Sequence, residues 1–276
     1  MTAENKSQPA DLNEETRNLW DQKASFWDNK MGDNGNDFQR LLVGPASERL
    51  LNLQPGETVL EIACGSGVFA RRMAQLGVHV IATDFSAQFL ERARARSSGY
   101  AGNIEYRLLD ATRENQIVAL GKQRFDAVVC NMAMMDMTEI NPLMRGIRQV
   151  LKPGGRFVFS LTHPCFNNTG MAFCVEEVTV NGEIVTTYSV KITKYLHTEP
   201  QKGVGMVGEP ISHYYFDRPL HTIFNACFNV GLLLDGLEEP AFNHPYDGSQ
   251  SSRLLSWINY NEIPPVLVAR LRIPVN

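Results

Sequence analysis

The stretch at residues 59–67, VLEIACGSG, constrains the fold of this 276-residue chain more than any other. A short apolar run ends there in small residues, and apolar residues at helical spacing follow at once: Val68, Phe69, Met73 and Leu76. A strand that turns directly into a helix brings backbone N–H groups close to a polar ligand, because glycine has no Cβ in the way. The stretch is therefore a candidate ligand-binding loop, although turns of this kind also occur as plain connections.

Strand-like and helix-like segments alternate along the rest of the chain. Apolar runs that predict strands lie at residues 58–63, 78–83, 104–109, 125–130, 156–162, 232–237 and 266–273. Helical patterns separate them, including one at 138–151 and one at 219–230. Such alternation is typical of βαβ units. We therefore predict an α/β fold with a mostly parallel seven-stranded sheet and helices on both faces.

The alternation is interrupted after the strand at 156–162. Residues 175–180 and 184–195 are rich in β-formers and flank Asn181-Gly182, which is a strong hairpin signal. We predict three parts: a tail and cap helices at 1–52, a core at 53–163 and 218–276, and an antiparallel lid insertion at 164–217. Residues 1 to about 14 are expected to be unstructured. A connection of this length is usually functional. The insertion is therefore expected to be a lid, and a dimerisation arm is the alternative.

Polar side chains follow three successive predicted strands. Asp84, Asp110 and Asn131 stand at their carboxyl ends, where open α/β sheets bind ligands. A carboxylate about 20 residues after a glycine turn can accept both hydroxyls of a ribose, and Asp84 meets this requirement. Asp110 could then meet the exocyclic amine of a purine, and the small Ala111 leaves room for the ring. Each residue could alternatively be a helix cap or a loop polar group.

These motifs, taken in order, resemble the class I S-adenosylmethionine-dependent methyltransferases that act on small molecules. The matching pieces are VLEIACGSG at 59–67, ATDFS at 82–86, LDA at 109–111, FDAVVCN at 125–131 and LKPGGRF at 151–157. Ala63 departs from the pattern, since it stands where the family often has its first glycine. The resemblance implies a Rossmann-like fold whose last strand is antiparallel.

The same resemblance implies a site for S-adenosylmethionine. The backbone at 65–67 would lie against the methionine part, Glu61 would fix the turn, Asp84 would bind the ribose, and Asn131 would hold the methionine end. The expected cofactor-binding residues are Glu61, Ala63, Gly65, Ser66, Gly67, Asp84, Phe85, Ser86, Asp110, Ala111, Asn131 and Met132. The chemistry would be an in-line displacement at an activated methyl group, which needs no metal in principle.

The acceptor side is less constrained. His163 follows the strand at 156–162, so it could deprotonate an acceptor, line the pocket, or serve only in packing. It is the candidate catalytic residue. The expected substrate-binding residues are Phe26, Trp27, His163, Phe166, His213, Tyr214 and Tyr215.

Composition limits the partners. The formal net charge of −4 offers no basic surface for nucleic acid, and no apolar run is long enough to span a membrane. The N-terminal residues show no secretory signal, and the five cysteines lack metal-ligand spacing. We therefore expect a cytoplasmic monomer or homodimer that acts on a small molecule, with no nucleic acid, membrane or metal partner.

Two other functions fit parts of the pattern. An NAD(P)-dependent oxidoreductase also has a glycine turn and a later acid. The third glycine of its G-x-G-x-x-G motif is missing here, because Ala70 stands at that position. A catalytically silent S-adenosylmethionine-binding protein could retain the same fold.

Overall fold

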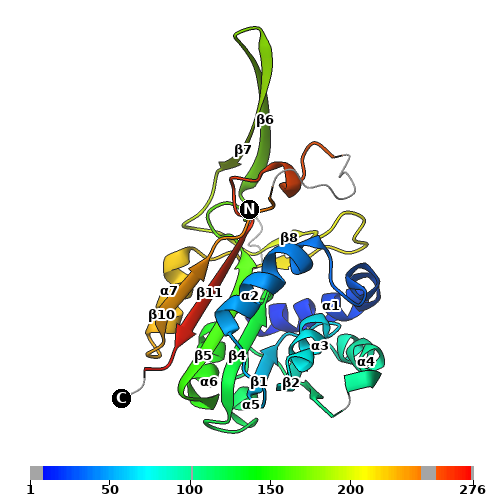
Figure 1. Ribbon diagram of the computed structural model, residues 1–276, viewed down its shortest axis with the longest axis vertical. Coiled ribbons are helices and arrows are strands. Elements are labelled where there is room, and N and C mark those ends of the chain that lie inside the picture. The colour runs from blue at the N-terminus through cyan, green and yellow to red at the C-terminus, as the bar shows by residue number, and fades with distance from the viewer. Residues whose placement is uncertain (1–8, 101, 244–252, 275–276) are drawn as a thin grey trace, which may run out of the picture.

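The computed structural model describes residues 9–100, 102–243 and 253–274. Its centre is a seven-stranded sheet with the order β10-β11-β5-β4-β1-β2-β3 (Figure 1). The parallel strands are β1 (Thr58–Ile62), β2 (His79–Asp84), β3 (Ile104–Leu108), β4 (Phe125–Asn131) and β5 (Leu151–Thr162). The strands β10 (Leu233–Glu238) and β11 (Val266–Arg272) complete it, with β11 antiparallel to both β5 and β10. The predicted sheet and its antiparallel last strand are confirmed.

The central strands are apolar throughout because both faces of the sheet are covered. Along β1, Val59 belongs to one buried cluster, whereas Leu60 and Ile62 belong to the other. The first cluster takes in residues of α2 (Gly44–Leu51), α3 (Val68–Gln75) and α4 (Ala87–Arg96). The second takes in residues of α5 (Glu114–Val118), α6 (Asn141–Val150) and α7 (Leu220–Phe228). Alternate side chains of each strand therefore fill two separate cores, one on each face.

The N-terminal region is more ordered than the sequence predicts. The helix α1 (Pro9–Met31) begins well before residue 14, so the expectation of an unstructured chain to that point is wrong for residues 9–14. It packs against α4 and against β9 (His213–Tyr215). A short π-helical segment, η1 (Phe38–Val43), leads from it into α2.

Residues 164–217 form two separate β structures. The predicted hairpin is present as β6 (Met171–Val180) and β7 (Glu183–Ile192), and it projects far beyond the body of the molecule (Figure 1). A second, short pair, β8 (Gln201–Gly203) with β9, was not predicted. The pair β8–β9 lies beside α1, so the two halves of the insertion have different surroundings.

Within the part of the chain that the structure describes, the hairpin packs on other elements through its base. Phe173 of β6 contacts Trp257 and Tyr260, and Tyr188 of β7 contacts Tyr260, with ring centroids 4.6 to 5.3 Å apart. These partners lie in and just after η4 (Trp257–Asn259). Residues 176–187, which form the outer part and the turn, are all exposed.

Two shorter 3-10 segments complete the described elements: η2 (Ser98–Tyr100) and η3 (Met134–Asp136). Within the described ranges, none of the helices has the length and apolar character needed to cross a bilayer. The division into tail, core and lid remains a prediction.

We predict that the outer hairpin contributes little to folding. Residues 177–186 can be replaced by Asn-Gly, which leaves Glu176 and Thr187 as the closing pair. This pair is four residues from the natural closing pair, Val180 and Glu183, so the alternating hydrogen-bond pattern of the ladder is kept. Because the removed residues are exposed, the free energy of unfolding measured in urea should change by less than about 1 kcal/mol. A loss of several kcal/mol would show that the arm is part of the fold.

Candidate functional site

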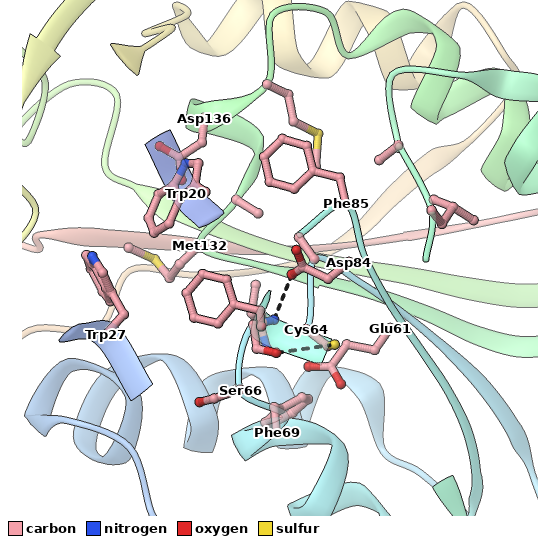
Figure 2. A pocket seen from close by; sticks show the side chains of 18 of the residues that line it. Trp20, Trp27, Glu61, Cys64, Ser66, Phe69, Asp84, Phe85, Met132 and Asp136 are labelled. Atoms are coloured by element: carbon pink, nitrogen blue, oxygen red, sulfur yellow. Dashed lines mark hydrogen bonds between the residues drawn. The ribbon is translucent and has the colours of Figure 1, made fainter. Parts of the chain in front are cut away.

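A cavity opens at the carboxyl edge of the sheet, above β1, β2, β3 and β4 (Figure 2). Its floor is formed by the residues that follow these strands, and α1 lies over it. The lining residues from the strand ends are Glu61, Ala63, Cys64, Gly65, Ser66, Asp84, Phe85, Leu109, Asp110, Ala111, Thr112, Asn131, Met132, Ala133, Asp136 and Met137.

The turn between β1 and α3 has the geometry of a close backbone approach. Gly65 has φ +53°, and a Cβ built there would meet only Phe89, at 3.9 Å. Gly67 has φ +75°, but its Cβ would lie 2.4 Å from Tyr106 Oη and 3.2 Å from the Cβ of Ala93. Gly65 therefore leaves room toward the cavity, whereas Gly67 leaves room for packing inside the protein.

Ala63 occupies the position of the missing glycine and has φ +55°. A non-glycine residue in this region costs about 1–2 kcal/mol. Met132, which follows β4 and also lines the cavity, has φ +51°. Strain of this kind is often found at binding sites, where the surrounding structure holds it in place.

Asp84 ties two of the strand ends together. Its Oδ2 accepts a hydrogen bond of 2.9 Å from Gly65 N, and its Oδ1 accepts one of 2.9 Å from Ser86 N. Burial raises the pKa of Asp84 to about 6, although these two N–H groups favour the ionised form. Each carboxylate oxygen keeps a further lone pair, so the side chain can still accept two hydrogen bonds from a ligand.

Glu61 lies beside Asp84 at the end of β1 and is 3 % exposed. Burial, together with the charge of Asp84, raises its pKa to about 8, although Arg71 opposes the shift. Its Oε2 has no hydrogen-bond partner among the described residues. At neutral pH the floor of the cavity therefore favours a protonated Glu61 beside an ionised Asp84.

Asn131 presents its amide nitrogen without a partner. Its Oδ1 accepts hydrogen bonds from Ser47 Oγ (2.9 Å) and Ser160 Oγ (3.0 Å), which fixes the orientation of the amide. Its Nδ2 is buried and has no hydrogen-bond partner within the described ranges. An unpaired buried donor is costly, so a ligand acceptor is the natural partner for it.

Asp110 at the end of β3 is already engaged by protein donors. Its Oδ1 accepts bonds from Thr112 N (2.9 Å) and Thr112 Oγ1 (2.6 Å), and its Oδ2 accepts one from Asn13 Nδ2 (2.8 Å). Asn13 belongs to α1, so this bond joins the helix to the edge of the sheet.

One face of α1 forms a wall of the cavity. Asn13, Trp20, Trp27 and Met31 line it, and intervals of seven, seven and four residues place them on one stripe of the helix. The indole rings of Trp20 and Trp27 lie 5.4 Å apart. Trp27 was predicted from the sequence, whereas the others were missed. The seven-residue interval between the two tryptophans was the available signal.

Most of the predicted cofactor residues come together in this cavity. Gly67 and Ser86 are not among its lining residues. Gly67 packs on Tyr106, as described above. Ser86 is the N-cap of α4: its Oγ accepts a hydrogen bond from Phe89 N (3.1 Å) and donates one to Asp21 Oδ1 (2.5 Å), so its hydroxyl is already used.

His163 is not among the lining residues either. It is 1 % exposed, its Nε2 lies 2.7 Å from Glu239 Oε1, and its Nδ1 accepts a hydrogen bond from Cys165 N (3.1 Å). Phe166 packs on its ring at 4.6 Å. Burial lowers the pKa of His163, although Glu239 favours the charged form. The end of β5 lies on the β11 side of β4, so this geometry favours the packing alternative for His163.

The remaining predicted substrate residues lie around α1. Phe26 is one position from Trp27, about 100° around the helix, and its ring faces Lys30 at 5.7 Å instead of lining the cavity. The hydroxyl of Tyr214 donates to the Glu15 carboxylate. His213 and Tyr215 pack on each other at 4.5 Å, and His213 contacts Trp20 at 4.7 Å, directly behind the lining.

The lid at 164–217 remains a prediction. The cavity lining includes no residue from 164–217. Among the described residues no group of three or more His, Cys, Asp or Glu side chains could hold a metal ion.

Comparison with known proteins gives a consistent result. Residues 59–155 match a family model described as a methyltransferase domain. A demethylmenaquinone methyltransferase from Clavibacter sepedonicus is 32 % identical over 142 residues, which is 51 % of this chain and 55 % of that protein. A ubiquinone biosynthesis O-methyltransferase from Xanthomonas campestris pv. campestris is 30 % identical over 124 residues, 45 % of this chain and 49 % of that protein. The chain thus spans about half the length of the curated relatives it matches.

Solved structures extend the likeness to the whole fold. The crystal structure of an S-adenosylmethionine-dependent methyltransferase from Mesorhizobium loti superposes with a TM-score of 0.63 at 25 % identity, over 83 % of this chain and 96 % of that one. The matched residues 59–155 contain the β1–α3 turn, Asp84, Asp110 and Asn131. Residues 59–155 therefore match a methyltransferase domain, in a chain that is similar in fold to a solved S-adenosylmethionine-dependent methyltransferase.

Proposed function

We propose that this chain transfers a methyl group from S-adenosylmethionine to a small planar acceptor. One observation carries the proposal. Asn131 and Asp84 end β4 and β2, and Gly65 and Asp110 come just after β1 and β3; because these strands are adjacent in the order β4-β1-β2-β3, the four residues form one row along the cavity. With a strand spacing of about 4.8 Å, this row is about 14 Å long, which suits an extended nucleoside joined to an amino acid.

The residues of the row fit the parts of that cofactor in sequence. Asp84 would accept the two ribose hydroxyls through its remaining lone pairs. The free Nδ2 of Asn131 would donate to the methionine carboxylate, and the open side of Gly65 would lie against the methionine chain. Asp110 and Ala111 would border the adenine, with Asn13 as an additional contact. When bound, the cofactor supplies a methyl group activated by its sulfonium.

The wall contributed by α1 would exclude water and hold the acceptor. Trp20, Trp27, Met31, Met132 and Met137 form an apolar surface beyond the row. Such a surface suits a flat acceptor, because aromatic side chains bury large areas against planar molecules. The names of both curated relatives, which refer to demethylmenaquinone and to ubiquinone biosynthesis, agree with an acceptor of this shape.

The proposal also includes the location, oligomeric state and partners expected from the sequence. We propose a cytoplasmic monomer or homodimer that uses neither nucleic acid nor a membrane as partner. The antiparallel strand β11 favours this function over an NAD(P)-dependent oxidoreductase, because the resemblance to methyltransferases implies such a strand.

Two measurements test the proposal. Calorimetric titration of the purified protein with S-adenosylmethionine and with NADH should show binding of the first alone. Incubation with methyl-labelled S-adenosylmethionine and metabolite extracts should then move the label into a small molecule. Binding of NADH alone would support the oxidoreductase, whereas binding of S-adenosylmethionine without transfer to any extract would support the silent binding protein.

We predict that Asp84→Ala weakens S-adenosylmethionine binding at least tenfold, because charge-assisted hydrogen bonds to both ribose hydroxyls are lost. The matched control is Asp126→Ala. Asp126 also accepts a backbone hydrogen bond at an end of β1, from Thr58 N at 2.9 Å, but at the opposite edge of the sheet. Calorimetry should show near wild-type affinity for the control. Equal affinities for the two folded variants would remove the ribose assignment.

Gly65 and Gly67 should respond differently to the same substitution. Gly65→Ala places its methyl group toward the cavity, so ligand affinity should fall at least tenfold while the free energy of unfolding falls by about 1–2 kcal/mol. Gly67→Ala meets Tyr106 Oη, which is held by Ser97 Oγ at 2.7 Å, so it should lose more stability. Urea denaturation and calorimetry check both. If Gly65→Ala binds S-adenosylmethionine normally, the turn is only a connection.

A further inference from the structure

Asp136 is a buried carboxyl group that the cofactor row does not use. It ends η3, in the segment that follows β4, and it is 9 % exposed and lines the cavity. Its Oδ1 has no hydrogen-bond partner among the described residues. In Figure 2 Asp136 and Trp20 appear beyond Met132, on the side away from Asp84 and Glu61. An unsatisfied acceptor at this end of the cavity is costly unless a ligand donates to it.

A fixed ion pair lies behind Asp136. Lys23 Nζ is 2.8 Å from Glu209 Oε1, and both side chains are fully buried. Glu209 also accepts hydrogen bonds from Trp27 Nε1 (2.8 Å) and Gly205 N (2.6 Å). Although burial opposes ionisation, these donors and His213 lower the pKa of Glu209 to about 2. Lys23 therefore already has a permanent counterion and is not reserved for Asp136.

His213 fills the space between this ion pair and Asp136. Its Nε2 is 3.7 Å from Asp136 Oδ1, and its Nδ1 is 3.4 Å from Glu209 Oε1. Its ring is held between Trp20 and Tyr215, with centroids 4.7 and 4.5 Å away. Burial lowers the pKa of His213, so the ring is neutral at neutral pH. The distance to Asp136 is too long for a hydrogen bond, so His213 does not satisfy Asp136 Oδ1.

We infer that Asp136 binds the nucleophilic O–H or N–H group of the methyl acceptor and takes its proton during transfer. The inference rests on the proposed function and extends it, since it limits the acceptor to a planar molecule with a proton-bearing nucleophile. Trp20 and Trp27 would hold the ring of the acceptor, and Asp136 would aim its O–H or N–H group.

The reaction balances with the groups present. A bond forms between the acceptor O or N and the methyl carbon, and the bond between that carbon and sulfur breaks. The electron pair of the broken bond stays on sulfur, which gives the neutral S-adenosylhomocysteine. The proton of the acceptor goes to the Asp136 carboxylate and from there to solvent on product release.

The surroundings of Asp136 strengthen it as a proton acceptor. Burial raises its pKa well above the ordinary value, Lys23 opposes the shift, and the charges of Glu209 and Asp217 add to it. A carboxylate whose pKa is raised is a stronger base than an ordinary one, which suits it to accept a proton from the acceptor. The titratable groups that face it are Lys23 on α1, Cys130 on β4, Glu209, His213 and Tyr215 from the β8–β9 segment, and Asp217.

The test compares two cofactor analogues that differ at the methyl position. S-adenosylhomocysteine has a neutral sulfur there, whereas sinefungin carries an ammonium group in place of the methyl group. If an ionised Asp136 faces this position, the wild-type protein should bind sinefungin at least tenfold more tightly than S-adenosylhomocysteine near pH 8. The ratio should fall as the pH is lowered, because a protonated Asp136 offers no charge to the ammonium group.

The isosteric variant Asp136→Asn should bind sinefungin and S-adenosylhomocysteine with affinities within about twofold of each other, and this ratio should not depend on pH. Its affinity for S-adenosylhomocysteine should stay within about threefold of wild type. Glu139→Gln removes an equal charge from an exposed position three residues away and should keep the wild-type ratio. Because the wild-type pH series needs no variant, the test does not depend on the folding of Asp136→Asn.

The two proposals fail in different ways. If S-adenosylhomocysteine binds normally but the ratio is near one in the wild type, or is unchanged in Asp136→Asn, the inference about Asp136 is overturned and the proposed function stands. If the wild-type protein binds neither analogue, the proposed function is overturned, and the inference about Asp136 with it.

Discussion

The hydrogen bond from Gly65 N to the Asp84 carboxylate, 2.9 Å long, joins the turn after β1 to the end of β2, and the site depends on it. The turn can approach Asp84 because Gly65 adopts a positive φ with no Cβ facing the cavity. The same carboxylate accepts a hydrogen bond from Ser86 N at the start of α4, so one side chain sets the positions of two loops. Burial keeps this carboxylate away from bulk water, and a ligand hydroxyl is then a strong partner for it.

The helix α1 completes the site from above the sheet. Through Asn13 it bonds to Asp110, and through Trp20 and Trp27 it forms the wall at the acceptor end. The buried pair of Lys23 and Glu209 holds α1 to the segment before β9. The helix α1 thus contributes to both ends of the cavity, whereas the proposed acceptor end depends in addition on the segment before β9.

The fold was predictable because its signals are local. The apolar runs, the small-residue turn and the Asn181-Gly182 hairpin turn each act within a few residues, and the cofactor row follows from the strand ends. The acceptor end was not predictable to the same degree. Asp136, His213 and Trp20 come from distant parts of the sequence, and their meeting depends on how α1 and β9 pack. His163 was chosen for its place after β5, but the local chain turns its ring toward Glu239 and Phe166.

The central claim is that the row from Asn131 to Asp110 is the cofactor site, and a crystal structure of the protein with S-adenosylhomocysteine tests it most directly. The account predicts both ribose hydroxyls on the Asp84 carboxylate, the amino-acid carboxylate on Asn131 Nδ2, and the sulfur facing the end of the cavity that holds Asp136. A ligand bound outside this cavity, or bound in it with its adenine against Asp136, would contradict the account.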